Sequence, residues 1–332
     1  MVATDVTGRL AACFGLAMDG CRRLTSGNSS DSWAVEAGGR EYVLRIAPED
    51  TDVSMLELRM DLARRLGLLG APMAAVVASP AGRLVERIDI DGRERLATAL
   101  VKAAGTTHDR LATDTVDVSL FEAVGSGLAT LHGASLRLGD AAAALPAWEI
   151  EDNCFNLVDP EPYAAAFPDV MAAYRKRRSA CLGLPRTAGS YGLIHADIHF
   201  DNIVVAPGGG IRFCDFDDLC RGWFAMDLAM VVFDLAVVLE GPDRDAALAR
   251  HIAATLEAYK RGAAAAGGPD RLDLDALRPF IALLEAAVYL QCTEFMDGAG
   301  EGTWVQRFCD GRRERILCGR DYLDGLRITR MA

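Results

Sequence analysis

LIHADIHFDN at residues 193–202 and FCDFDD at residues 213–218 are the two stretches that decide the fold. Two short β-rich runs lie between them, 203–205 and 211–213, joined by the turn PGGG at 207–210. This pattern predicts a short β-hairpin, since proline and glycine mark the turn and apolar residues fill the runs. Because a hairpin brings its two ends together, the acidic residues that flank it are expected to share one site.

The spacing of polar residues in these stretches suits phosphoryl transfer. That reaction needs a carboxylate to orient the attacking hydroxyl and accept its proton, and oxygen ligands to hold Mg²⁺ against the phosphates. A His-x-Asp-x-x-x-x-Asn loop, here His195 to Asn202, supplies both on one tight turn. Asp215 comes from the far side of the hairpin and is expected to complete the metal shell, because Mg²⁺ prefers carboxylate and amide oxygens together with water.

The loop and hairpin resemble the catalytic-loop motif of the aminoglycoside phosphotransferase and choline kinase superfamily, whose members are relatives of the protein kinases. The resemblance implies that Asp197 is the catalytic base. It implies that Asn202 is a Mg²⁺ ligand and that Asp215 is the second metal ligand, in the place of the aspartate of the protein-kinase Asp-Phe-Gly motif. ATP is then the phosphoryl donor.

Four further side chains are expected to support this site. His195 is expected to hold the catalytic loop by hydrogen bonds, and His199 to pack in the loop or contact phosphate. Asp217 lies where protein kinases have glycine, and Asp227 resembles the family aspartate that braces the catalytic loop. The two histidines also have the spacing of a zinc pair on a helix, but the Glu that follows the first His in that motif is missing here and the surrounding pattern is that of a strand.

The resemblance extends to the front half of the chain, where it implies a nucleotide site. Gly27, Asn28 and Ser29 look like the family's short phosphate-covering turn, whose backbone N–H groups approach phosphate oxygens. Arg45 occupies the strand position that usually carries a phosphate-binding lysine, and Glu57 on the next helix matches that residue's ion-pair partner. Arginine grips phosphate bidentately, so this substitution need not abolish nucleotide binding.

The backbone of Val101 and Ala103 falls where the family has its hinge between lobes, and would hydrogen-bond the adenine edge. The resemblance covers about residues 24–240. It implies an α+β, bilobal, protein-kinase-like fold. The expected division is an N-terminal nucleotide-binding lobe, residues 1–103, and a helical catalytic and substrate-binding lobe, residues 104–332.

The apolar pattern agrees with this division. Short β-rich runs separated by turn-forming residues occupy 33–35, 42–46, 73–78, 83–90 and 96–101. Apolar residues at helical spacing predict one helix among them, over 53–69. Long Ala- and Leu-rich helical stretches follow at 120–131, 162–178, 224–239, 244–265 and 274–295. We therefore expect a small antiparallel sheet lobe with one helix and a larger, mainly helical lobe.

Composition excludes several classes of function. The net charge of −12 argues against a nucleic-acid partner, which would need concentrated Lys and Arg, and is compatible with a cationic substrate. No long uncharged apolar run indicates a membrane span, and the N-terminus lacks the pattern of a signal peptide. The nine cysteines are an odd number with no C-x-x-C pair, so reduced thiols and a cytoplasmic location are expected.

The acceptor is expected to be a hydroxyl of a small molecule such as an aminoglycoside, an amino alcohol or a related metabolite. Glu294 and Asp297 would neutralise an amino-bearing acceptor, or would simply be solvated surface acids. The same motif is shared by bacterial protein Ser/Thr kinases and homoserine-type kinases, so these alternatives stay open. A non-catalytic nucleotide-binding regulatory module is a further alternative, which the arginine at position 45 keeps open.

Overall fold

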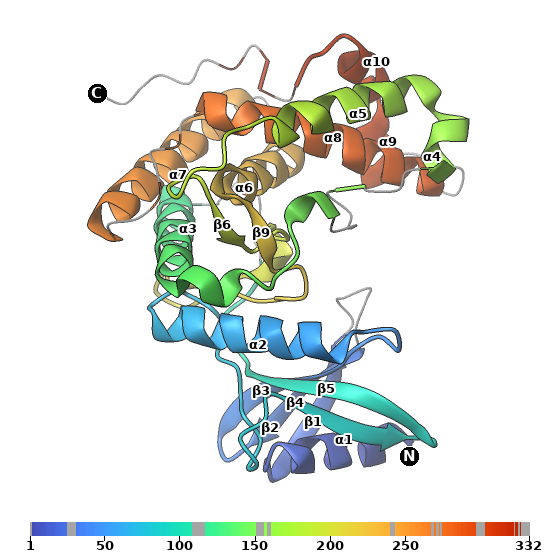
Figure 1. Ribbon diagram of the computed structural model, residues 1–332, viewed down its shortest axis with the longest axis vertical. Helices are drawn as coiled ribbons and strands as arrows, with labels where there is room; N and C mark the ends of the chain where they lie inside the picture. Colours follow the sequence, from blue (N-terminus) through green and yellow to red (C-terminus); the bar gives the residue numbers. More distant parts are fainter. Residues whose placement is uncertain are drawn as a thin grey trace.

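The computed structural model of the chain describes two bodies joined end to end, a sheet with two helices and a larger helical body (Figure 1). The described residues are 2–24, 31–107, 117–150, 156–157, 161–239, 243–266, 269, 272, 274–296, 303–321, 323–324 and 326. This arrangement confirms the expected α+β class, with an antiparallel sheet in the N-terminal part and mainly helices in the C-terminal part.

The sheet of the N-terminal body is antiparallel, with its strands in the order β1-β2-β3-β5-β4. Its strands are β1 (Met18–Leu24), β2 (Asp31–Ala37), β3 (Arg40–Ile46), β4 (Val85–Ile90) and β5 (Arg93–Val101). Gly38 and Gly39 join β2 to β3 with φ values of 56° and 74°. Two successive positive φ angles are those of the tight turn that matches the twist of a hairpin, and glycine adopts them without strain.

Two helices flank this sheet, where the sequence pattern predicts only one. The predicted helix is α2 (Val53–Leu68), which lies between the sheet and the helical body (Figure 1). The additional helix, α1 (Val2–Cys13), contains threonine, glycine and β-branched residues that are weak helix formers. It is stabilised by packing instead, because Leu10 and Ala11 of the helix, and Phe14 just after it, are buried in one cluster with Leu44 of β3. Burial outweighs intrinsic propensity in such a helix.

The predicted strand over residues 73–78 is absent as a strand. This segment runs from α2 to β4 and divides its hydrogen bonds between the two bodies. The N–H of Ala74 donates to the carbonyl of Phe213 at 2.8 Å, and the N–H of Val77 donates to the carbonyl of Ala99 at 2.8 Å. The β-rich composition of the segment thus produces isolated bridges, Met73 with Phe213 and Val76 with Leu100.

The helical body contains every long helix that the sequence predicts. Its helices are α3 (Val118–Leu138), α4 (Glu161–Ala166), α5 (Pro168–Leu182), α6 (Phe224–Val238), α7 (Arg244–Ala266), α8 (Leu274–Met296), α9 (Trp304–Cys309) and α10 (Arg312–Leu317). The stretch predicted as one helix over 162–178 is divided, since Pro168 starts a new helix after Phe167. Two small strand pairs complete the body: β6 (Tyr191–Ile194) with β9 (Cys220–Trp223), and β7 (Ile203–Val205) with β8 (Ile211–Phe213).

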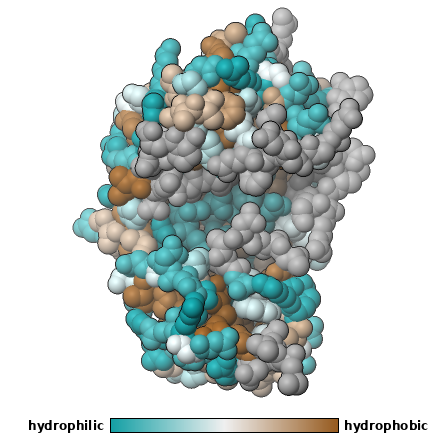
Figure 2. Space-filling view, turned by 90° about the vertical axis from the view of Figure 1, so that its right-hand side faces the viewer, coloured by the Kyte–Doolittle hydropathy of each residue, from teal (hydrophilic) through white to brown (hydrophobic). Residues whose placement is uncertain are grey.

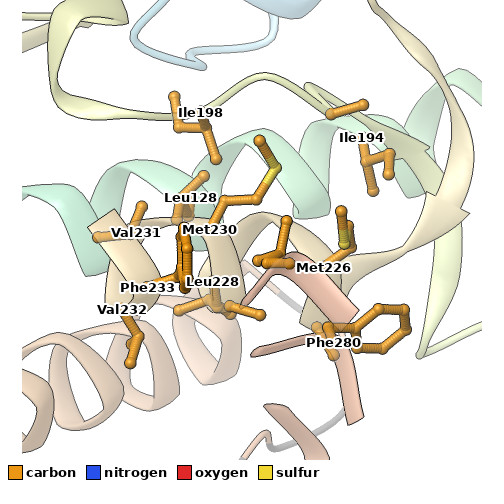
Figure 3. Close-up of a cluster of buried hydrophobic side chains, with 14 of the residues drawn as sticks. Leu128, Ile194, Ile198, Met226, Leu228, Met230, Val231, Val232, Phe233 and Phe280 are labelled. Atoms are coloured by element: carbon orange, nitrogen blue, oxygen red, sulfur yellow. The ribbon is translucent and has the colours of Figure 1, made fainter. Parts of the chain in front are cut away.

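Helix α6 runs through the centre of this body and is apolar apart from two acids, Asp227 and Asp234. Figure 3 shows its residues Met226, Leu228 and Phe233 packed with Leu128 of α3 and Phe280 of α8, and all of them are buried. A helix with so few polar residues is stable only inside a core. None of the helices in the described part of the chain has both the length and the apolarity needed to cross a membrane.

Helices α3 and α7 approach closely at Gly125. A Cβ at this position would lie 2.2 Å from the carbonyl oxygen of Thr255. We expect Gly125→Ala to destabilise the protein by about 1–3 kcal/mol, because backbone atoms must move apart. Gly67→Ala is the matched control, since its Cβ would meet nothing closer than 3.9 Å. That change should stabilise α2 by about 0.5–1 kcal/mol. Urea unfolding measures both; equal stabilities for the two variants would contradict the close contact.

Candidate active site

The backbone of the loop that follows β6 is held by the buried carboxylate of Asp227. Both oxygens of Asp227, in the first turn of α6, accept hydrogen bonds from consecutive backbone N–H groups, those of His195 and Ala196, each at 2.9 Å. His132 Nε2 lies 3.0 Å from the same carboxylate, and His132 Nδ1 lies 2.9 Å from the hydroxyl of Tyr259. Burial by itself would raise the pKa of Asp227, but the hydrogen bond and charge of His132 lower it below its usual value. Asp227 is therefore ionised.

The side chain of Asp197 is held in place by Asn202. The amide nitrogen of Asn202 donates to the Asp197 carboxylate at 2.7 Å and to the Asp197 carbonyl at 2.8 Å. The amide oxygen of Asn202 is then the atom that can bind a cation. Figure 2 shows a hollow between the bodies whose visible surface is hydrophilic. The Asp197 side chain keeps 17% of its surface exposed, so a substrate can reach it.

The hairpin joins this loop to Asp215. Strands β7 and β8 pair Ile203 with Phe213, and the N–H of Cys214 donates to the carbonyl of Asn202 at 3.0 Å. Asp215 follows with φ of 62°, a left-handed conformation that is uncommon for a residue other than glycine. The two acidic stretches therefore meet, as the sequence predicts for a hairpin of this length.

Arg45 reaches this site from β3. Its guanidinium donates to both carboxylate oxygens of Asp217, at 2.6 and 3.3 Å, and to Asp215 at 3.1 Å. The ion pair expected between Arg45 and Glu57 needs correction, because Arg45 pairs with these two aspartates of the helical body while Glu57 is exposed on α2. The apolar face of α2, with Leu56 and Met60, turns toward the core and directs Glu57 to solvent.

The two histidines of the loop face different partners. His195 is buried, and its Nε2 lies 3.1 Å from the carbonyl oxygen of Cys214, so it links the loop to the end of the hairpin. His199 Nε2 lies 3.6 Å from Asp197. Burial alone would lower the pKa of His199, but the carboxylate of Asp197 raises it to about 9. Each histidine is thus engaged with a different partner, Cys214 for His195 and Asp197 for His199, which does not fit a zinc pair.

The donor set fits a divalent cation that takes two ligands from the protein. Within the described residues, no three His, Cys, Asp or Glu side chains form a closed metal cluster. Mg²⁺ typically takes one or two carboxylates and completes its shell with water and phosphate oxygens, which matches Asn202 and Asp215. Burial, followed by the charge of Asp197, raises the pKa of nearby Asp218 to about 7. A cation would relieve this crowding of negative charge.

The expected nucleotide-binding residues are only partly within the described structure. Gly27, Asn28 and Ser29 lie outside the described residues. Val101 ends β5, and its N–H donates to the carbonyl of Ala75 at 2.8 Å, which leaves that group unavailable to a ligand. Ala103 follows in the segment that connects the sheet to the helical body.

The acids expected to contact the acceptor lie at the C-terminal end of α8 and beyond it. Glu294 belongs to α8, but its side chain lies outside the described residues, as does the whole of Asp297. Glu285, another acid of α8, is fully buried and accepts a hydrogen bond from Arg312 at 2.6 Å, so it is not available to a substrate.

A cavity of about 410 Å³ lies at the C-terminal end of α6, and none of its described lining residues belongs to the catalytic loop. Arginines and aspartates mix in its lining, including Arg244, Arg307 and Asp324. Because its lining carries charges of both signs, the cavity has no evident preference for a cationic substrate.

Two residues that hold the backbone near the site are missing from the sequence prediction. Asp234 of α6 accepts a hydrogen bond from the N–H of Phe200 at 2.8 Å and so fixes the second end of the loop. Its signal in the sequence is a spacing of seven from Asp227 within an otherwise apolar helix, which puts both acids on one face. Arg59 of α2 donates to the carbonyl of Leu219 at 3.1 Å, and no sequence pattern distinguishes it from the other arginines of that helix.

A sheet body and a helical body that meet at an Asp-Asn-Asp site define a kinase-like phosphotransferase. A sequence profile described as "Phosphotransferase enzyme family" matches residues 20–287. The chain belongs to this family, and it is a phosphotransferase with a hydroxyl group as acceptor. The expected superfamily is thereby confirmed.

Two characterised kinases are similar to this chain in sequence. Amicoumacin kinase of Bacillus subtilis (strain 168) is 26% identical over 240 residues, which cover 70% of this chain and 68% of that protein. Homoserine kinase of Neisseria meningitidis serogroup B is 29% identical over 220 residues, which cover 64% of this chain and 65% of that protein.

Solved structures show that the fold is shared. An amicoumacin kinase in complex with AMP-PNP, Ca²⁺ and Ami superposes with a TM-score of 0.80 at 20% identity, covering 96% of this chain and 94% of that one. A microcompartment-associated aminopropanol kinase gives 0.65 at 21% identity, covering 98% of this chain and 100% of that one. The first of these two structures thus contains a nucleotide analogue together with a divalent metal.

The buried contacts of Asp227 generate a test of stability. Asp227→Ala leaves two backbone N–H groups and His132 without their acceptor in the core. We expect a loss of about 3–5 kcal/mol in the free energy of unfolding, because removing one partner of a buried charged network is strongly destabilising. Asp201→Ala in the same loop is the control, since 64% of that side chain is exposed. Its effect should stay within about 0.5 kcal/mol. Urea unfolding of both variants distinguishes the two cases; similar losses would contradict the assigned role.

Proposed function

We propose that the protein transfers the γ-phosphoryl group of ATP to a hydroxyl of a small molecule, with Mg²⁺. The observation that carries this proposal is the convergence of three groups from two chain segments. Asn202 hydrogen-bonds Asp197 at 2.7 Å and accepts from the residue before Asp215 at 3.0 Å. One group to receive a proton and two to hold a cation are what phosphoryl transfer requires of a protein.

In this proposal Asp197 orients the acceptor hydroxyl and accepts its proton. The hydrogen bond from Asn202 fixes the direction of the Asp197 carboxylate, so the acceptor oxygen is positioned rather than activated by a strong base. Asp227 holds the loop backbone at His195, the side chain of His195 links the loop to the carbonyl of Cys214, and His199 lies 3.6 Å from Asp197. Most of the rate enhancement would come from positioning and charge neutralisation.

Asn202 and Asp215 would hold Mg²⁺, through an amide oxygen and a carboxylate. When bound, the metal neutralises phosphate charge in the site. Arg45 would bind the phosphates of ATP, and the turn of Gly27, Asn28 and Ser29 would cover them. The carboxylates of Asp197, Asp215 and Asp218 lie close enough to influence one another, and this supports a requirement for a divalent cation.

We propose that the two lobes divide near residue 103, with Val101 and Ala103 in the connecting hinge. The adenine ring would lie against this segment. Since the N–H of Val101 is already bonded within the protein, the hydrogen bonds to adenine would come from other backbone groups of the segment. Asp217 would act within the nucleotide site through its contact with Arg45.

A small acceptor is favoured over a protein acceptor. Strand β9 begins at Cys220, only five residues after Asp215, so the chain has no long segment there to hold a polypeptide substrate. The named relatives, amicoumacin kinase, homoserine kinase and aminopropanol kinase, carry the names of small-molecule acceptors. The net charge of −12 favours an amino-bearing acceptor, for which Glu294 and Asp297 remain the proposed contacts.

The proposed compartment is the cytoplasm. All eight cysteines among the described residues are free thiols, which is the usual state of cysteines in a reducing compartment.

A panel assay tests the proposed reaction. Mg²⁺-dependent ATP turnover is measured against aminoglycosides, amino alcohols and hydroxy amino acids. We expect acceptor-stimulated turnover, and we expect Asp197→Asn to lower kcat by about a hundredfold or more while nucleotide affinity is kept. Asp201→Asn, an exposed acid of the same loop, serves as the control. Tight Mg·ATP binding with no turnover on any acceptor would favour a regulatory module, and label transfer to proteins alone would favour a protein kinase.

A further inference from the structure

Arg45 is held by carboxylates of the opposite body. It projects from β3, where it pairs with Thr98 of β5 and Ser32 of β2 in the sheet. Its side chain keeps only 10% of its surface exposed. The fork of its guanidinium contacts both oxygens of Asp217, at 2.6 and 3.3 Å. Such two-point contacts between arginine and a carboxylate fix direction as well as distance.

The acids of helix α2 are directed elsewhere. The buried face of this helix carries Leu56 and Met60, which leaves Glu57 exposed to solvent. Asp61, the next acid, forms ion pairs with Arg64 and Arg65 of its own helix, at 3.0 and 2.7 Å.

The side chain that α2 directs toward the acidic stretch is instead a cation. Arg59 donates to the carbonyl of Leu219 at 3.1 Å. Burial raises the pKa values of Asp217 and Asp218, and the positive charge of Arg59 opposes that rise. The helix thus contributes positive charge to this region, and the carboxylates that hold Arg45 come from the helical body.

We propose that Asp217 is the positioning residue for Arg45, and that this contact across the cleft replaces an ion pair between Arg45 and the helix. This inference rests on the proposed function, in which Arg45 binds the phosphates of ATP. Because the contact is bidentate, Asp217 of the helical body fixes the direction in which the guanidinium of Arg45 points. Asn202 and Asp215, the proposed metal ligands, belong to the same body. The group that binds phosphate and the groups that bind the metal are then positioned by one rigid part of the protein.

The residue type at position 45 fits this arrangement. A guanidinium has five N–H donors in a planar fork, so it can hold a carboxylate along one edge and contact phosphate with others. An ammonium group is a point charge with three donors and no fixed plane. Arg45 contacts Asp215 as well as Asp217, at 3.1 Å, which an extended planar group can do from one position.

A double-mutant cycle tests the proposal on nucleotide binding. The dissociation constant of Mg·ATP is measured by calorimetry, without acceptor, for Arg45→Gln, Asp217→Asn and the double variant. We expect the effects to be non-additive by about fivefold or more, since the residues are in direct contact. The matched cycle uses Arg45→Gln with Glu57→Gln and should be additive within about twofold. Asp217→Glu should recover part of the affinity that Asp217→Asn loses.

Four outcomes decide between this proposal and its rivals. Coupling of Arg45 to Glu57 and not to Asp217 would overturn it. Additive effects at Asp217 with a raised Mg²⁺ requirement would place Asp217 in the metal shell and would also overturn it. Coupling seen in urea unfolding of the ligand-free protein but absent from Mg·ATP binding would make the pair structural only. A wild-type protein that binds no Mg·ATP would overturn the proposed function and the positioning role together, while the unfolding cycle still reports whether the ion pair exists.

Discussion

The ion-dipole contact between the buried Asp227 carboxylate and two consecutive backbone N–H groups is the interaction on which the site depends. Those N–H groups belong to His195 and Ala196, and Ala196 has φ of 63°. A left-handed conformation costs about 1–2 kcal/mol for a residue with a Cβ. The two charge-assisted hydrogen bonds offset this cost. The strained turn directs Asp197 away from the core.

Helix α6 holds both ends of the catalytic loop. It contributes two acids from one face, Asp227 to the start of the loop and Asp234 to Phe200. Burial raises the pKa of Asp234 to about 6, because a buried environment disfavours the charged carboxylate. An apolar helix packed on every side is a rigid support, so these contacts hold the loop at two points with Asp197 between them. Rigid support is what catalysis by positioning requires.

Local patterns in the sequence predict the elements of the site well. The turn at 207–210 and the runs beside it become β7 and β8, and the apolar spacing over 53–69 becomes α2. Local rules do not predict which charges meet across the cleft. Arg45 and Glu57 have the expected spacing along the chain, but the rotation of α2 and the reach of Asp217 from the other body decide the pairing. Helix α1 escapes prediction for a similar reason, because contacts with a distant sheet stabilise it.

The sheet body contacts the same hairpin of the helical body at two places. Before β4, the N–H of Phe213 donates to the carbonyl of Pro72 at 2.7 Å; in the segment that leads from β5 to the helical body, Thr106 and Val205 exchange backbone hydrogen bonds at 2.8 and 3.1 Å. Strands β7 and β8 thus lie between these two contacts. Any opening of the sheet body against the helical body must turn about an axis near this hairpin. Atoms on an axis of rotation move least, so Asn202 and Asp215 at its ends should keep their separation while the cleft admits and releases its ligands.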